Sequence, residues 1–79
     1  RKLIGLEIIS KGIARKGYNI IDDENNIIGS ITSGTMSPTL KKAIALAYLD
    51  IEFTKEGTIV FVEVRKKRIK AQVVKASFV

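Results

Sequence analysis

The sequence predicts an all-β fold, a small closed barrel or sandwich of about six short strands. Short stretches of the chain alternate apolar and polar residues with a period of two, which is typical of strands with one buried face. Polar or glycine-containing turns separate these stretches at regular spacing. The chain has 79 residues, 46% of them hydrophobic, so it forms at most one domain, spanning residues 1–79, with an efficiently filled core.

The first half of the chain predicts three strands. Residues 4–9 alternate and form the first strand, which Lys11 and Gly12 end. Residues 18–21 form a shorter second strand, and residues 27–32 form its hairpin partner. The residues between them, 22–26 (DDENN), form a polar turn, because Asp and Asn tolerate left-handed backbone and hydrogen-bond their own main chain.

The stretch TSGTMSPTL, residues 32–40, holds the chain's only proline and predicts a break in the strand pattern. Residues 33–34 are expected to end the third strand, since glycine permits a sharp bend. Ser37 is a suitable helix N-cap, and Pro38 suits the first helical position, where its missing N–H costs nothing. Residues 39–42 are therefore expected to form one short helical turn.

Residues 43–49 predict the fourth strand. Ile44, Leu46 and Tyr48 lie on one face of it and alanines lie on the other. A helix is the alternative for this segment, because Ala and Leu favour helix. We expect a strand.

The last third of the chain predicts a turn, two strands and a reversal between them. Residues 55–57 (KEG) form the turn, and residues 58–64 alternate cleanly, with three valines on one face. A tight reversal falls within residues 65–68. The inward residues of the last strand are expected to be Ile69, Ala71 and Val73.

The composition excludes several kinds of site. The chain has no cysteine and no histidine, so it has no disulfide framework and lacks the commonest metal ligand and the usual general base. No apolar run approaches the length of a membrane span, and no signal-peptide pattern opens the chain. We therefore expect a cytoplasmic protein without a membrane partner. The abrupt start at Arg1 and the unfinished end at Val79 suggest a piece of a longer polypeptide.

The net charge of +6 at pH 7 invites an anionic partner. Much of the excess lies in one basic run, made of Arg65, Lys66, Lys67, Arg68 and Lys70. The run could grip phosphates, or it could be a solvated hairpin tip that guards a strand edge. A nucleic-acid-binding barrel also needs aromatic stacking platforms, whereas the aromatic residues here are scattered and most are expected in the core.

Three further candidates have ordinary structural alternatives. The acidic residues 22–24 could bind a cation, but they lack the ligand spacing of a calcium loop, so a solvated turn is favoured. Thr32 and Ser33 carry hydroxyls with no histidine to activate them, which argues against catalysis within this chain. Arg15 could bind a carboxylate through both of its terminal nitrogens, or it could be a surface residue at a strand entrance.

The order of the motifs resembles a known family. Residues 12–18 (GIARKGY), 28–40 (IGSITSGTMSPTL) and 44–48 (IALAY) are similar, in sequence and in order, to the C-terminal barrel of the glycine cleavage system T protein. Those proteins are tetrahydrofolate-dependent aminomethyltransferases. The resemblance continues to the end of the chain at residues 77–79. Sarcosine and dimethylglycine dehydrogenases carry an equivalent barrel and remain an alternative.

The resemblance implies a fold and a role. The fold would be a six-stranded Greek-key barrel, similar to the C-terminal domain of elongation factor Tu. The parent enzyme would pass a one-carbon unit from the aminomethyl-lipoyl H protein to tetrahydrofolate and release ammonia. Its catalytic aspartate and most of its folate pocket would lie in domains that this chain lacks, so the barrel would be structural, would enclose the folate site and would be inactive alone.

Two parts of the chain become candidates for the folate rim or the domain interface. They are Arg15 and the bend at Thr32, Ser33 and Gly34, because barrel packing explains these residues least. The basic run becomes a candidate for attracting the polyglutamate tail of folate or an acidic H protein. The alternative from a different class is a free-standing nucleic-acid-binding barrel.

Overall fold

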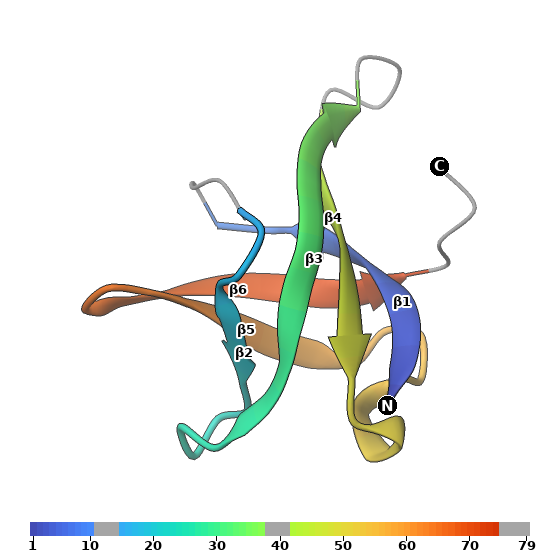
Figure 1. The fold of residues 1–79 in the computed structure, drawn as a ribbon, viewed down its shortest axis with the longest axis vertical. Helices are drawn as coiled ribbons and strands as arrows, with labels where there is room; N and C mark the ends of the chain where they lie inside the picture. The colour runs from blue at the N-terminus through green and yellow to red at the C-terminus, as the bar shows by residue number, and fades with distance from the viewer. Residues whose placement is uncertain (11–14, 38–41, 75–79) are drawn as a thin grey trace.

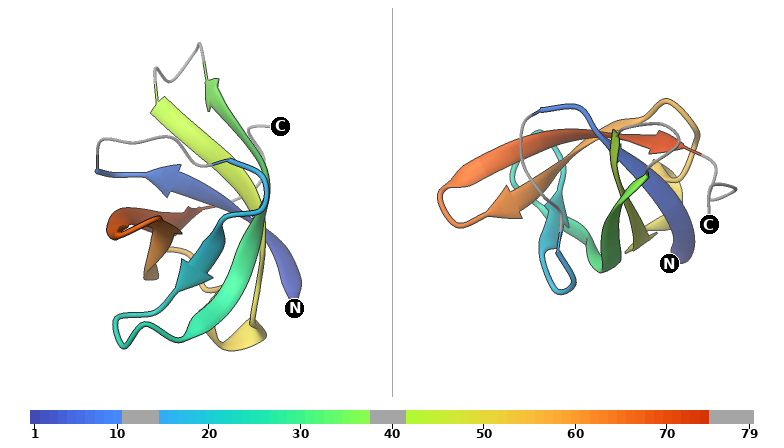
Figure 2. Two further views of the ribbon diagram at one scale, coloured as in Figure 1. Left: turned by 60° about the vertical axis from the view of Figure 1, so that its left-hand side comes forward. Right: turned by 90° about the horizontal axis from the view of Figure 1, so that it is seen from above.

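The computed structural model describes residues 1–10, 15–37 and 42–74, and these form a closed barrel of six antiparallel strands (Figures 1 and 2). Among the described residues, the strands are β1 (Lys2–Ile8), β2 (Asn19–Ile21), β3 (Ile27–Ser37), β4 (Lys42–Leu49), β5 (Ile59–Val64) and β6 (Lys67–Val74). Their order around the barrel is β1-β4-β3-β2-β5-β6, and β6 pairs with β1 to close it. Strands β2, β3 and β4 are consecutive neighbours and β1 lies beside β4, which is a Greek-key arrangement. The predicted barrel is confirmed.

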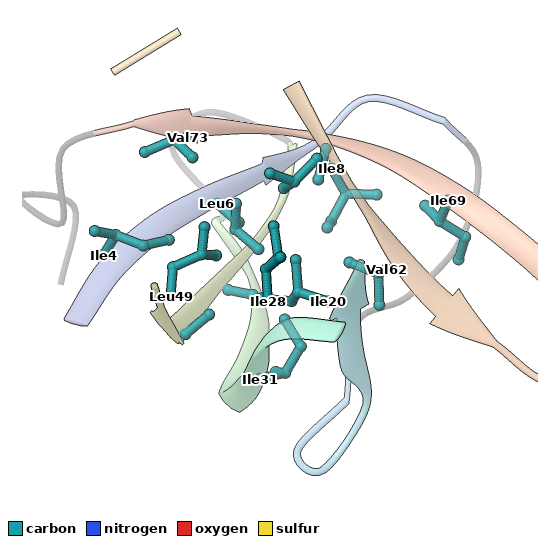
Figure 3. Close-up of a cluster of buried hydrophobic side chains, with 14 residues drawn as sticks. Ile4, Leu6, Ile8, Ile20, Ile28, Ile31, Leu49, Val62, Ile69 and Val73 are labelled. Atoms are coloured by element: carbon teal, nitrogen blue, oxygen red, sulfur yellow. The ribbon is translucent and has the colours of Figure 1, made fainter. Parts of the chain in front are cut away.

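The core fills the barrel with branched aliphatic side chains from every strand. Figure 3 shows these side chains converging between the strands. The largest fully buried side chains of the described residues are Leu6, Ile20, Ile21, Leu49, Val60, Val62 and Val73, and all of these except Ile21 belong to this cluster. No polar or charged residue among the described ones is buried. Burial of apolar surface and the backbone hydrogen bonds between paired strands therefore hold the described part of the barrel together.

The hairpin of β5 and β6 follows the predicted pattern. Val60 and Val62 are fully buried, and Ile69, Ala71 and Val73 point inward from β6. Arg65 adopts φ 56° in the two-residue turn between these strands, which is the left-handed region that tight hairpin turns need. The turn predicted at residues 55–57 is also present and precedes β5.

Strand β4 is confirmed, and its inward face carries the two alanines of this segment's centre, Ala45 and Ala47. Ala45, Ala47 and Leu49 belong to the core cluster, whereas Tyr48 is exposed. The alanines among these inward residues fit the limited room between the walls of a narrow barrel. On the other face, exposure differs from residue to residue: Tyr48 is exposed, Leu46 is half-buried and Ile44 is buried.

The aromatic residues only partly follow the expectation that most of them lie in the core. Tyr18 and Phe53 pack against the core cluster. Phe61 is half-buried, and Tyr48 is exposed on the barrel's outside. Phe78 lies outside the described residues.

The expected strand break at residues 33–34 is wrong. Strand β3 continues through Ser33 and Gly34 to Ser37, and both residues pair with β4. Instead of a break, the register shifts by one residue between Ile31 and Ser33. A β-bulge of this kind bends and twists a strand while its pairing continues, so the chain turns here without ending the strand.

The expected helical turn at residues 39–42 is mostly untested, because residues 38–41 lie outside the described part. Its two ends are corrected: Ser37 is the last residue of β3 and Lys42 is the first residue of β4. The helical turn that the described residues do show is η1 (Ile51–Phe53), directly after β4. Among the described residues, no helix has the length and apolarity needed to cross a membrane.

Candidate functional site

The Arg15 turn lies directly beside β3. Tyr18 N–H donates to the carbonyl of Arg15 at 3.2 Å and closes the turn, in which Gly17 adopts φ 94°. Gly17 N–H then donates to the carbonyl of Ile31 at 2.9 Å, and Ile31 N–H donates to the carbonyl of Tyr18 at 2.8 Å. Two of the sequence candidates, Arg15 and the stretch beginning at Thr32, are thus brought to neighbouring positions by backbone hydrogen bonds at Ile31.

Thr32 is the extra residue of the β3 bulge. Ile31 pairs with Ala47 and Ser33 pairs with Leu46, so Thr32 has no partner of its own on β4. Its hydroxyl donates to the carbonyl of Leu46 at 3.0 Å. A bulge leaves a ladder group without its backbone partner, and the Thr32 hydroxyl supplies a donor at that point. This favours the structural explanation for Thr32, a side chain that holds the bend.

Replacing Thr32 with valine should therefore destabilise the chain by about 1–2 kcal/mol, because the half-buried Leu46 carbonyl loses its hydroxyl donor while the side-chain shape is kept. Urea unfolding of the 79-residue chain measures this. Thr32→Ser keeps the hydroxyl and is the matched control, with the smaller expected loss. A valine variant at least as stable as the parent would show that the hydroxyl does not hold the bulge.

Arg15, Ser33 and Gly34 are solvent-exposed. Arg15 forms no ion pair and no side-chain hydrogen bond with another described residue, so its guanidinium is available to an anionic group. The guanidinium presents two parallel donors, a geometry suited to a carboxylate. The backbone hydrogen bonds at Ile31 therefore bring the candidate residues to neighbouring positions. Arg15 is the charged residue among these candidates, and it is followed in the same turn by exposed Lys16.

All five cations of the basic run are exposed, but Arg68 differs from the other four in its contacts with other side chains. The Arg68 guanidinium lies 4.8 Å from the centre of the Phe61 ring and donates to Asn25 Oδ1 at 3.2 Å. Arg68 therefore links the β5–β6 hairpin to the β2–β3 turn. The four other cations are exposed and form no ion pair with another described residue: Arg65, Lys66, Lys67 and Lys70. The exposure of these residues fits the solvated hairpin tip considered from the sequence, and phosphate binding by the run stays a prediction.

The acidic turn is organised around Asp22. Its Oδ1 accepts hydrogen bonds from the backbone N–H groups of Glu24 and Asn26, each at 2.9 Å, and its Oδ2 accepts from the Asn26 side chain at 3.2 Å. The backbone N–H of Asn26 is the main cause that lowers the pKa of Asp22 below its usual 3.8. Among the described residues, no group of three potential ligands could hold a metal ion. Asp22 therefore shapes the turn.

The lowered pKa of Asp22 predicts a specific pH dependence. A carboxyl with a depressed folded-state pKa stabilises the fold above 3.8 and loses that contribution as the pH falls through the folded-state value. Asp22→Asn keeps an oxygen acceptor but removes the charge. We expect the parent to melt at a higher temperature than the variant at about pH 7, and the difference to shrink below about pH 4. A difference that stays constant across this range would contradict the assignment.

Sequence reasoning missed one surface feature, the outer face of β4. Tyr48 is exposed beside its cross-strand partners Leu3 and Ser30. The period-two pattern did place Leu46 and Tyr48 on one face, but it could not say which face lies outside. A bulky apolar face opposite a face of alanines is the signal that could have identified it.

Comparisons with known proteins agree on one family. The profile described as "Glycine cleavage T-protein C-terminal barrel domain" matches residues 1–79. The chain is 55% identical to an aminomethyltransferase from Picosynechococcus and 51% identical to one from Bacillus subtilis, in each case over 99% of the chain and 21% of the relative. It superposes with a TM-score of 0.88 on the glycine cleavage system aminomethyltransferase T from Bartonella henselae, at 35% identity, covering 98% of this chain and 21% of that one.

The chain spans about a fifth of the length of these relatives. The family profile, the sequence identities and the shared fold all cover essentially the whole chain. The chain therefore belongs to the glycine cleavage T-protein C-terminal barrel domain family.

Proposed function

We propose that this chain is the C-terminal domain of an aminomethyltransferase of the glycine cleavage system. The parent enzyme transfers the one-carbon unit from the aminomethyl-lipoyl H protein to tetrahydrofolate and releases ammonia. One observation carries the proposal: identity of 55% and 51% to proteins named aminomethyltransferase over 99% of the chain. The H protein and the other glycine cleavage components are the partners that follow, and a cytoplasmic location is consistent with them.

The barrel's proposed role is to complete the enzyme and to enclose its folate site, without performing chemistry. Two features support this division of labour. The chain has no histidine, and the Thr32 hydroxyl is committed to the Leu46 carbonyl. When tetrahydrofolate is bound, it is the acceptor of the one-carbon unit. Of the candidate rim residues, exposed Arg15 suits a folate carboxylate, whereas Thr32 holds the backbone that carries Ser33 and Gly34.

Arg15 can be tested in a grafted enzyme, made by replacing the C-terminal barrel of the Bacillus subtilis aminomethyltransferase with residues 1–79 of this chain. If Arg15 binds a folate carboxylate, Arg15→Ala should raise the KM for tetrahydrofolate by about tenfold or more, because a charge-assisted contact is worth roughly 1.5–3 kcal/mol. Lys55→Ala, which removes an exposed cation in the turn before β5 and outside the candidate sites, is the matched control. Unchanged kinetics in the Arg15 variant would remove it from the folate rim.

The isolated chain separates the proposed function from the nucleic-acid alternative. Isothermal titration with tetrahydrofolate and with short single-stranded RNA, each at two salt concentrations, should show no binding to either, because the folate pocket is built mostly by the rest of the enzyme. The exposed cations at residues 65–70 make salt-sensitive RNA binding the outcome to look for. RNA binding in the micromolar range or tighter, weakened by salt, would favour the nucleic-acid-binding barrel.

A further inference from the structure

We propose that the tip of the β5–β6 hairpin is a docking surface for an acidic face of the separate protein that delivers the aminomethyl group. The basic tip is defined by Arg65, Lys66, Lys67 and Lys70, which are exposed and form no ion pair with another described residue. The inference rests on the proposed function, because the delivering protein, the H protein, is a partner of the parent enzyme. It adds a contact at residues that lie outside the candidate folate rim.

Positive charge sets the basic tip apart from the rest of the surface. Residues 65–70 hold five of the chain's 14 lysines and arginines, and without them the net charge would fall from +6 to +1. The hairpin, residues 59–74, contains one acidic residue, Glu63, and its cross-strand partner is Arg68. Nearly all of the chain's excess positive charge is therefore carried by one hairpin, where it produces a local positive potential.

The backbone of the turn indicates that a cation at its apex matters. Arg65 is the first of the two residues between the paired Val64 and Lys67, and it adopts φ 56°. Glycine, asparagine and aspartate adopt this left-handed conformation most readily in hairpin turns. An arginine accepts a less favourable backbone there, and residues in such conformations are concentrated at functional sites. The backbone alone therefore does not explain an arginine at this position, whereas a role for its charge does.

Arg68 fixes the hairpin that carries the tip. Its guanidinium lies 4.8 Å from the centre of the Phe61 ring, donates to Asn25 Oδ1 at 3.2 Å and donates to the carbonyl oxygen of Asp23 at 3.5 Å. These contacts tie the hairpin to the β2–β3 turn, so the four tip cations are carried on a positioned support. A surface held in place before binding loses less conformational entropy when a partner docks.

The shape and the composition of the tip favour a protein over a nucleic acid. Figures 1 and 2 show the β5–β6 hairpin projecting from the barrel, so the cations lie on a projection. Proteins that bind single-stranded nucleic acid combine a basic groove with exposed rings on which bases stack. Phe61, the aromatic residue of this hairpin, is half-buried and has the Arg68 guanidinium over its ring. A projecting set of cations is complementary to carboxylates on the face of a folded partner.

Docking through exposed charges suits a protein that must bind and leave in every catalytic cycle. Opposite charges at the rim of an interface increase the association rate without requiring tight binding. Their effect extends over about 10 Å at about 0.1 M salt and falls as salt is added. The basic tip therefore guides the H protein to the enzyme, and the interaction should be sensitive to ionic strength.

The test uses two double variants with the same change in net charge. Lys66→Glu with Lys67→Glu reverses charge at the tip, and Lys2→Glu with Lys55→Glu reverses charge at exposed lysines elsewhere. Binding of each grafted enzyme to lipoylated H protein from Bacillus subtilis is measured by surface plasmon resonance at about 0.05 M and about 0.5 M salt. At the lower salt, the tip variant should bind about tenfold more weakly, mainly through slower association, and the control less than about threefold more weakly. At the higher salt, both differences should fall to about twofold or less.

Each other outcome has a defined meaning. Equal losses in the two double variants, or a loss at the tip that salt does not reduce, would overturn the inference. Weaker binding of single-stranded RNA by the tip variant, with unchanged binding of H protein, would assign the tip to nucleic acid and would also overturn it. Both double variants of the isolated chain should melt within a few degrees of the parent, since all four positions are exposed. If one of them unfolds, Lys66→Ala is compared with Lys55→Ala instead.

The binding measurement is independent of turnover, so the two proposals fail separately. Tip-dependent binding by a graft without activity would contradict the proposed function and leave the docking surface intact. An active graft whose binding of H protein does not depend on the basic tip would contradict this inference alone. A parent graft that binds no H protein would contradict both.

Discussion

Replacing Gly29 with alanine is expected to destabilise the barrel by about 3 kcal/mol or more. The added methyl group would collide with backbone atoms, which cannot move without moving the whole strand. Gly29 lies on β3 opposite Leu49. A Cβ at this position would overlap the carbonyl oxygen of Tyr48 and would lie 3.1 Å from the Cα of Leu49. Both obstacles belong to the β4 backbone, so relief of the clash requires the two strands to separate.

The measurement for Gly29→Ala is urea unfolding of the 79-residue chain, followed by circular dichroism. For a domain of this size, a loss of about 3 kcal/mol lowers the melting temperature by roughly 12–24 °C. Ser30→Ala is the matched control, because it places the same side chain one residue further along β3, beside Tyr48. A Gly29 variant as stable as Ser30→Ala would show that β3 and β4 do not approach as closely as described.

Truncating Leu6 to alanine is the second change with a large expected effect. Leu6 lies on β1 with no exposed surface, and it belongs to the core cluster that all six described strands build (Figure 3). Removing its branched end leaves a cavity that the closed barrel cannot collapse to fill. We expect a loss of about 3–4 kcal/mol, within the usual range for buried leucines.

Leu3 provides the matched control for Leu6, because it is the same residue type on the same strand but 43% exposed. Leu3→Ala should cost less than about 1 kcal/mol in the isolated chain. Thermal melting of both variants measures the difference. Equal effects at the two positions would contradict the orientation of β1, since successive residues of a strand face opposite sides of the sheet and Leu3 and Leu6 are an odd number of residues apart.

The sequence could predict the strands because its hydrophobic pattern has the right period. The alternation at residues 59–64 and at residues 69–73 belongs to the two strands that form the most regular hairpin of the fold. For Val60, Val62 and Ile69, pattern and burial agree. Period alone was less informative for β4, whose two faces are both apolar. The alanines face inward there because the space across the barrel, which the sequence does not show, limits side-chain size.

The region around Thr32 could not be predicted in the same way. Glycine and serine at residues 33–34 have low strand propensity, which favours a break. Pairing with β4 overrides that propensity, and the bulge at Thr32 absorbs the bend through a bond to Leu46. The proximity of the Arg15 turn to this bulge depends on backbone hydrogen bonds at Ile31. Such contacts join residues far apart in sequence and leave no local signal.

The central claim is that this barrel completes an aminomethyltransferase whose chemistry lies in other domains. The most direct measurement is the rate of tetrahydrofolate-dependent ammonia release from aminomethyl-lipoyl H protein. Three samples are compared: the grafted enzyme, the same enzyme without any C-terminal barrel, and the 79-residue chain alone. We predict activity in the grafted enzyme and none in the other two samples. Turnover by the isolated chain, or a grafted enzyme no more active than the truncated one, would contradict the claim.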